Sequence, residues 1–180
     1  MRRRRSMLKG VVAGLVGGFV GTVAMTVFQK GWTAAANKLN GDQEQAPEHK
    51  RKTDQSQDKN EDSTVKVAGK IADQAGIQLT TQEKKQAGSI VHYGFGTAMG
   101  LLFGCLREVA PRKVLRYPAL TGMGFGSLVF LGADETAVPA LKLSAQPSEK
   151  PASEHAYELA GHVIYGLTTG YVTKAVRSAL

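Results

Sequence analysis

The sequence predicts an all-α fold: a bundle of four transmembrane helices with glycine-mediated packing, joined by a short amphipathic helix and a disordered polar loop. Three observations predict it: apolar segments of membrane-spanning length, glycines at four-residue spacing inside them, and basic clusters that flank them. About twenty apolar residues cross a bilayer core, and small residues one helical turn apart let membrane helices approach closely. The 180 residues suffice for one domain.

Composition argues against nucleic-acid binding and excludes an internal disulfide. The formal net charge is +8, but the basic clusters flank apolar glycine-rich segments instead of alternating with aromatic residues. This placement is typical of membrane proteins and not of nucleic-acid-binding proteins, so we expect no nucleic-acid partner. Cys105 is the single cysteine, so the chain cannot form an internal disulfide.

Residues 1–36 contain a basic N-terminus and the first predicted transmembrane helix. No charged residue occurs between Lys9 and Lys30. One face of this helix carries a packing row of glycines at Gly10, Gly14, Gly18 and Gly21. The alternative is a twin-arginine export signal with a cleavage site near 34–36. Three further apolar segments argue against this alternative.

Residues 37–80 form a polar linker that we place outside the cytoplasm. Its first part, 37–62, has too few apolar residues to bury a core, so we expect it to be disordered. An apolar stripe at helical spacing predicts a short amphipathic helix at about 63–75, which Gly76 ends. This helix lies either on the membrane surface or against the end of the bundle.

Residues 81–180 form the membrane domain with three further helices. Thr80 and Glu83 make a capping box at the start of a long helix, whose transmembrane part is about 87–106. Pro111 prevents this helix from continuing, and the third transmembrane helix covers about 118–133. The second helix carries a further packing row at Gly96, Gly100 and Gly104.

The fourth transmembrane helix covers about 155–176, and its apolar part is 159–173. Gly166 and Gly170 lie on one face and predict close approach of a neighbouring helix. If the N-terminus is cytoplasmic, four spans place every basic cluster and both termini on the cytoplasmic side, as the positive-inside rule requires. The third loop, with Lys142 and Lys150, then lies outside.

This topology brings five ionisable residues to the outer end of the bundle. His92 opens the second span, Asp134 and Glu135 follow the third, and Glu158 and His162 open the fourth. Buried ionisable groups are costly in a membrane and therefore indicate function by default. The two other histidines, His49 and His155, are expected to be solvated.

Three interpretations of this polar cluster remain open. His92, Glu158 and His162 are candidate metal ligands, although the Glu158–His162 spacing is i,i+4 and bundle di-iron sites use Glu-x-x-His. Alternatively, histidines beside carboxylates titrate near neutral pH and would sense external acidification. In the third interpretation, His162 hydrogen-bonds to Glu158 and the cluster only ties helix ends together.

The C-terminal half resembles the YagU-like family, small bacterial inner-membrane proteins classed as a domain of unknown function. The resemblance covers about 87–177, and its most specific element is the Glu-x-x-Gly-His of Glu158 and His162. The chain differs from the family pattern in its polar insertion at 37–85 and in the pair Asp134-Glu135. The resemblance implies a multi-pass protein of the bacterial inner membrane, and it transfers no catalytic residues.

We therefore expect a non-enzymatic membrane protein without a cofactor, whose partner is the lipid bilayer; a homo-oligomer remains open. Its hypothesised role is that of a structural or stress-related component with a proton-responsive cluster at the outer face. The alternative is a metal-binding protein, either a transporter or a metal-dependent enzyme. Ser89, Ser127 and Cys105 have no histidine partner that the sequence predicts.

Overall fold

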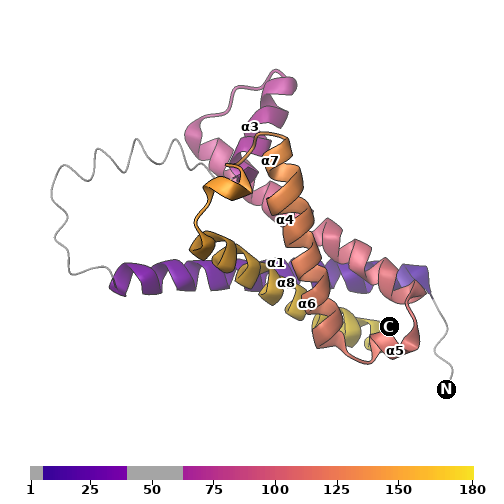
Figure 1. Cartoon of the computed structure of the whole chain (residues 1–180). Coiled ribbons are helices and arrows are strands. Elements are labelled where there is room, and N and C mark those ends of the chain that lie inside the picture. The colour runs from indigo at the N-terminus through magenta and orange to yellow at the C-terminus, as the bar shows by residue number, and fades with distance from the viewer. Residues whose placement is uncertain (1–5, 40–62) are drawn as a thin grey trace. The chain divides into compact units, whose positions relative to one another are not determined.

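The computed structural model describes residues 6–39 and 63–180, and every regular element within them is helical (Figure 1), which confirms the predicted all-α class. The run Arg2–Arg5 and the segment 40–62, with its predicted disorder, lie outside the described residues. The elements are α1 (Met7–Leu39), α3 (Ser63–Gln74), α4 (Thr81–Val109), α5 (Arg112–Leu115), α6 (Pro118–Val129), the π-helix η1 (Phe130–Ala137), α7 (Val138–Ala140), the 3-10 helix η2 (Pro147–Glu149) and α8 (Ala152–Ala179).

Two of the described helices are long and apolar enough to cross a membrane, α1 over Met7–Lys38 and α4 over Thr81–Val109. Their length and composition indicate membrane association. The chain divides into two compact units, which we describe separately. The hairpin unit covers residues 29–91, and the core unit covers residues 1–28 and 92–180.

In the hairpin unit, α3 packs against the first turns of α4. A Cβ atom built on Gly88 would lie 3.0 Å from the backbone of Val65, so only glycine allows this approach. The apolar stripe of α3, formed by Val65, Ala68, Gly69 and Ala72, is buried. The apolar face of α3 therefore contacts α4.

Local signals in the sequence fix the ends of both hairpin helices. Gly76 has a φ of 71°, and the Ile77 amide donates to the Ala72 carbonyl at 2.9 Å, which together close α3 in a Schellman motif. At the start of α4, the Thr80 amide donates to Glu83 at 2.8 Å and the Glu83 amide donates to the Thr80 hydroxyl at 3.3 Å. These bonds form the predicted capping box, and the Thr80 side chain lowers the pKa of Glu83 below its ordinary value.

In the core unit, α1 and α4 run past each other in opposite directions, with glycines at each contact. A Cβ atom on Gly14 would lie 2.4 Å from the Gly100 carbonyl oxygen, and one on Gly18 would lie 2.6 Å from that of Gly96. Gly10 lies equally close to the Gly104 backbone. Another face of α1 contacts α8, where Gly21 lies against Tyr165 and Thr169.

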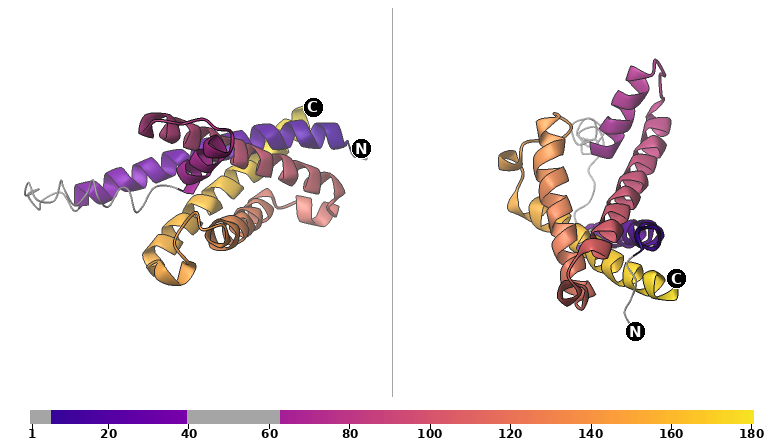
Figure 2. Two further views of the ribbon diagram at one scale, coloured as in Figure 1. Left: turned by 90° about the horizontal axis from the view of Figure 1, so that it is seen from above. Right: turned by 90° about the vertical axis from the view of Figure 1, so that its right-hand side faces the viewer.

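The helices α6 and α8 also run in opposite directions past each other (Figures 1 and 2). A Cβ atom on Gly122 would lie 2.2 Å from the Gly166 carbonyl oxygen, and one on Gly170 would lie 2.4 Å from that of Pro118. Gly166 and Gly170 therefore face α6, whereas the glycine row of α4 faces α1. The contact between α6 and α8 positions the polar residues that follow α6.

The third helix continues beyond its predicted end at Ala133. Figure 1 shows α6, η1 and α7 as one continuous rod, which runs from Pro118 to Ala140 and so extends the third helix beyond the predicted 118–133. The charged pair Asp134-Glu135 lies inside the π-helical part. Pro139 follows without a backbone N–H, and a wider helical turn accommodates the missing hydrogen bond. Lys142, with φ of 56°, ends the rod.

Candidate functional site

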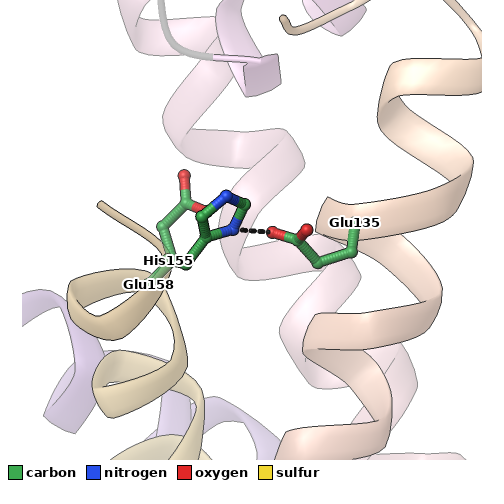
Figure 3. A group of neighbouring side chains, drawn as sticks. All are labelled: Glu135, His155 and Glu158. Atoms are coloured by element: carbon green, nitrogen blue, oxygen red, sulfur yellow. Dashed lines mark hydrogen bonds and ion pairs between the residues drawn. The ribbon is translucent and has the colours of Figure 1, made fainter. Parts of the chain in front are cut away.

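The candidate site forms where η1 lies beside the first turns of α8. Gly126 on α6 brings the two helices together at this end, because a Cβ atom there would lie 2.1 Å from the His162 carbonyl oxygen. The loop between α7 and α8 returns through η2 and adds Lys150 to the same region. Figure 3 shows His155 and Glu158 on α8 with Glu135 on the facing helix.

His155 makes two hydrogen bonds that together require an additional proton. Its Nε2 lies 3.0 Å from the Pro147 carbonyl oxygen, and its Nδ1 lies 2.8 Å from Oε1 of Glu135. A carbonyl oxygen only accepts, so Nε2 carries a hydrogen and the neutral ring would present a lone pair to the carboxylate. The short second contact therefore needs a proton on Nδ1 or on Glu135.

The surroundings of His155 favour its charged form. The hydrogen bond with Glu135 is the main cause that raises the pKa of His155 above its ordinary value, and the bond to Pro147 and the charge of Glu158 add to it. His155 precedes the apolar part of α8. Its side chain keeps 28% of its surface exposed, so protons reach it from solvent.

Lys150 supplies a fixed positive charge to the other carboxylate of the site. Its Nζ lies 2.8 and 3.1 Å from the two oxygens of Glu158 and 3.9 Å from Glu154. Burial alone would lower the pKa of Lys150, but the bond with Glu158 and the charges of Glu158, Glu154 and Glu135 together raise it. This lysine therefore stays charged and holds the loop against α8.

His162 repeats the arrangement of His155 two turns further along α8. Its Nδ1 lies 3.0 Å from the Glu158 carbonyl oxygen, and its Nε2 lies 3.6 Å from Oδ2 of Asp134. The ring is buried and its centroid lies 5.6 Å from that of Phe130. The consecutive residues Asp134 and Glu135 thus face two histidines on one side of α8.

Glu135, His155 and Glu158 offer three ligand-type atoms that all lie within 4.8 Å of one another. This set differs from the predicted metal candidates His92, Glu158 and His162. Both oxygens of Glu158 already bind the ammonium of Lys150. The distance of 2.8 Å between His155 and Glu135 is that of a charge-assisted hydrogen bond. The contacts of these three residues are therefore ion pairs and hydrogen bonds with one another and with Lys150.

The structure brings together four of the five residues of the predicted polar cluster, namely Asp134, Glu135, Glu158 and His162. His92 lies on α4, where its ring meets Tyr93 edge-on at 5.7 Å. His155, which we expected to be solvated, keeps 28% of its side-chain surface exposed but also bonds to Glu135. His155 lies three residues before Glu158 and seven before His162, so it shares their helix face. This spacing could have predicted that His155 belongs to the cluster.

A second charged group, which the sequence did not predict, lies at the opposite end of the core unit. Arg177 on α8 donates from Nε to Oε1 of Glu108 and from Nη2 to Oε2 at 3.3 Å. The Ser6 amide, just before α1, donates to the same Oε2 at 2.9 Å. Both charged side chains are buried, at 6% and 8% exposure. This pair links the ends of α1, α4 and α8.

Comparison with known proteins identifies a family and no individual relative. No curated protein and no solved structure matches the chain. One family model, described as "Protein of unknown function (DUF1440)", matches residues 47–171. The match begins inside the polar linker and extends past the histidine–carboxylate cluster. The chain therefore belongs to the DUF1440 family, the YagU-like proteins of unknown function.

Proposed function

We propose that the chain is a non-enzymatic, structural or stress-related protein of the bacterial inner membrane. In this proposal four helices span the bilayer with both termini in the cytoplasm: α1, α4, the rod of α6 and η1, and α8. The histidine–carboxylate cluster lies at the outer face, where it binds a proton from outside and releases it as the external pH rises.

The observation that carries the membrane proposal is that the core unit buries threonines and exposes many large apolar side chains. Its largest fully buried side chains are threonines, Thr22, Thr169 and Thr173. Large apolar side chains on all four helices are exposed, among them Phe19 at 52%, Leu102 at 44%, Leu128 at 68% and Tyr171 at 53%. A protein folded in water buries such side chains, whereas a bilayer solvates them.

Polar contacts between the helices support the same proposal. The Tyr165 hydroxyl donates to the Gly96 carbonyl at 2.7 Å, and the Thr169 hydroxyl donates to that of Gly17 at 3.3 Å. Small residues and interhelical hydrogen bonds stabilise helix association in lipid, where no hydrophobic driving force acts between helices. These hydroxyls end on backbone carbonyls, so we assign them to packing and not to a transport path.

Charge distribution supports the orientation. Residues 106–118 and 170–180, at one end of the core unit, contain six basic residues and one acidic residue. Residues 134–158, at the other end, contain five acidic and two basic residues. The positive-inside rule places the first end in the cytoplasm and the cluster outside.

The packing of α1 argues against the alternative of a cleaved twin-arginine signal. Its residues Gly14 and Gly18 contact α4, and Gly17 and Gly21 contact α8. Removal of this helix would leave the glycine-lined face of α4 and the face of α8 with Tyr165, Thr169 and Thr173 without a partner. We therefore assign α1 to the folded protein.

The proton step follows from the two hydrogen bonds of His155. When the proton leaves, Nδ1 and the Glu135 carboxylate face each other as two acceptors, and their attraction is lost. Asp134, Glu154, Glu158 and Lys150 are the other charged groups around this position. Because the folded pKa is raised above about 6.5, the contact contributes fully below that pH and is lost as the pH rises through the folded value.

Hydrogen exchange of the reconstituted protein tests this step. After correction for intrinsic exchange rates, the amides of residues 134–140 should lose protection between acidic and mildly alkaline pH in the wild type. In His155→Gln the protection should be low and independent of pH, while the matched variant His92→Gln keeps the wild-type profile. Protection that does not change with pH in the wild type would contradict the proton assignment. Binding of one divalent metal ion per chain that is lost in His155→Gln would contradict it as well.

A further inference from the structure

We propose that the surface around α5 binds the headgroups of anionic phospholipids on the cytoplasmic leaflet. We call this surface the α5 patch and define it by Lys113, Val114, Arg116 and Tyr117. The inference rests on the proposed membrane topology and adds a lipid class to it.

The position of the α5 patch in the chain sets its depth in the membrane. The helix α5 lies between Pro111 and Pro118, which separate it from the end of α4 and the start of α6. If α4 leads into the cytoplasm and α6 leads back, the seven residues 111–117 that join them remain at the headgroup layer. A connection this short stays close to the two helix ends and so to the headgroup layer.

The side chains of the patch suit that layer. Lys113 and Arg116 are exposed, and beside them Val114 and Tyr117 expose 46% and 58% of their surface. Tyrosine is enriched at membrane interfaces because its ring is apolar and its hydroxyl is polar. Lysine and arginine bind phosphate groups as hydrogen-bond donors and as positive charges. Basic side chains with an apolar and an aromatic neighbour match a phospholipid headgroup and its first acyl carbons.

Neighbouring charges make the patch a positive surface. Within the same end of the core unit, Arg177 is compensated by Glu108, and the guanidinium of Arg107 lies 5.7 Å above the Phe103 ring. Lys174, one turn beyond the contact between Gly170 and Pro118, is exposed and adds to the positive charge of Lys113 and Arg116. Charge complementarity therefore favours an anionic lipid over a zwitterionic one.

Lipid selectivity of the full-length protein in phosphatidylcholine vesicles tests the inference. Electron spin resonance compares spin-labelled phosphatidylglycerol with spin-labelled phosphatidylcholine at the protein surface. The wild type should prefer phosphatidylglycerol, and Lys113→Gln/Arg116→Gln should lose most of this preference, since each removed charge lowers headgroup affinity about fivefold. The matched variant Lys85→Gln/Lys142→Gln, with the same net charge, should keep it.

Two further arms separate the explanations. Inorganic phosphate and chloride at equal ionic strength should reduce the preference equally, through screening; a larger effect of phosphate would show a site for free phosphate and overturn the lipid assignment. Equal preferences in wild type and double variant would overturn it as well. Extraction with alkaline carbonate, done first, reports on the membrane topology itself, because a protein released by carbonate fails the proposed function before any lipid is tested.

Discussion

Each histidine on the buried side of α8 has one ring nitrogen bonded to a backbone carbonyl oxygen and the other facing a carboxylate of η1. For His155 the carboxylate is Glu135 at 2.8 Å, and for His162 it is Asp134 at 3.6 Å. The backbone bond fixes which nitrogen carries a hydrogen, so the second nitrogen meets the acid as a lone pair unless a proton lies between them. The shorter pair, at His155, is therefore the one to which we assign proton binding in the proposed function.

Removal of the Glu135 carboxylate should shift the pKa of His155 back toward its ordinary value. We expect the pKa of His155, followed by NMR of the labelled ring, to lie above about 6.5 in the wild type and to fall toward that value in Glu135→Gln. Glu149→Gln removes a carboxylate from the same loop that does not contact His155 and should leave the titration unchanged. Identical titration curves in wild type and Glu135→Gln would show that the hydrogen bond does not set the pKa.

Loss of one charge from the buried pair of Glu108 and Arg177 should destabilise the protein more than loss of both charges. Glu108→Gln leaves a guanidinium buried without its carboxylate, and we expect a loss of about 3 kcal/mol in unfolding free energy. The double variant Glu108→Leu/Arg177→Met should recover most of that loss, because neither charge remains. Glu154→Gln, whose side chain is 47% exposed and lies 3.9 Å from Nζ of Lys150, should cost less than about 1 kcal/mol. Unfolding in mixed micelles measures all three, and equal losses in the single and double variants would contradict this view.

Spacing along one helix predicted part of the site. Glu158 and His162 share a face of α8, and Asp134-Glu135 follow the third helix, so the sequence brought these residues to one end of the bundle. It missed Lys150 because that contact depends on how the loop through η2 folds back, which no helical period encodes. It missed Glu108 because a single acid in a basic cluster has no pattern that marks it as buried.

Glycine pairs determine how closely α1 approaches α4 and how closely α6 approaches α8. At Gly122 the added Cβ atom would meet the backbone of Gly166 at 2.2 Å, whereas at Gly124, two residues along the same helix, no described heavy atom lies within 4 Å. The same residue type therefore has opposite consequences on two faces of α6.

Substitution of these two glycines by alanine should separate packing from helix propensity. Gly122→Ala should destabilise the protein by about 1–3 kcal/mol because the backbones of α6 and α8 must move apart. Gly124→Ala should stabilise it by up to about 1 kcal/mol, the gain of alanine over glycine inside a helix. Thermal unfolding in detergent measures both. A stabilising Gly122→Ala would mean that the two helices do not pack through this face.

Helix ends with a chemical signature were predictable, and the continuation of the third helix was not. The capping box at Thr80, the left-handed Gly76 and the proline at the start of α6 mark their boundaries by backbone hydrogen-bonding rules that act locally. The rod from Pro118 to Ala140 contains two acids and Pro139, which all argue locally for an end. Tertiary contacts with α8 override these signals. The wider turn of the π-helix η1 accommodates Pro139, whose backbone nitrogen cannot donate a hydrogen bond.

At the scale of the whole molecule, burial and charge are the two properties that support a membrane protein. Glycine and threonine line most of the helix contacts, together with a few aromatic side chains such as Phe103, Phe130 and Tyr165, while many large apolar side chains face outward. The basic and acidic ends of the core unit then give the four proposed spans a direction. Among the described helices, α1 and α4 are the two that are apolar enough to be identified as spans by themselves, so the third and fourth spans most need an experimental test.

The loop between α7 and α8 distinguishes four spans from two. With four spans this loop lies outside the cytoplasm, and with spans at α1 and α4 alone it lies inside. In a Cys105→Ala background, Ala145→Cys places a thiol at an exposed position of this loop, and Lys113→Cys places one on α5. We predict that a membrane-impermeant maleimide applied to cells with a permeabilised outer membrane labels Ala145→Cys and leaves Lys113→Cys unlabelled until the inner membrane is opened. An Ala145→Cys thiol that reacts only after the inner membrane is opened would contradict the four-span topology and, with it, the outer position of the proton site.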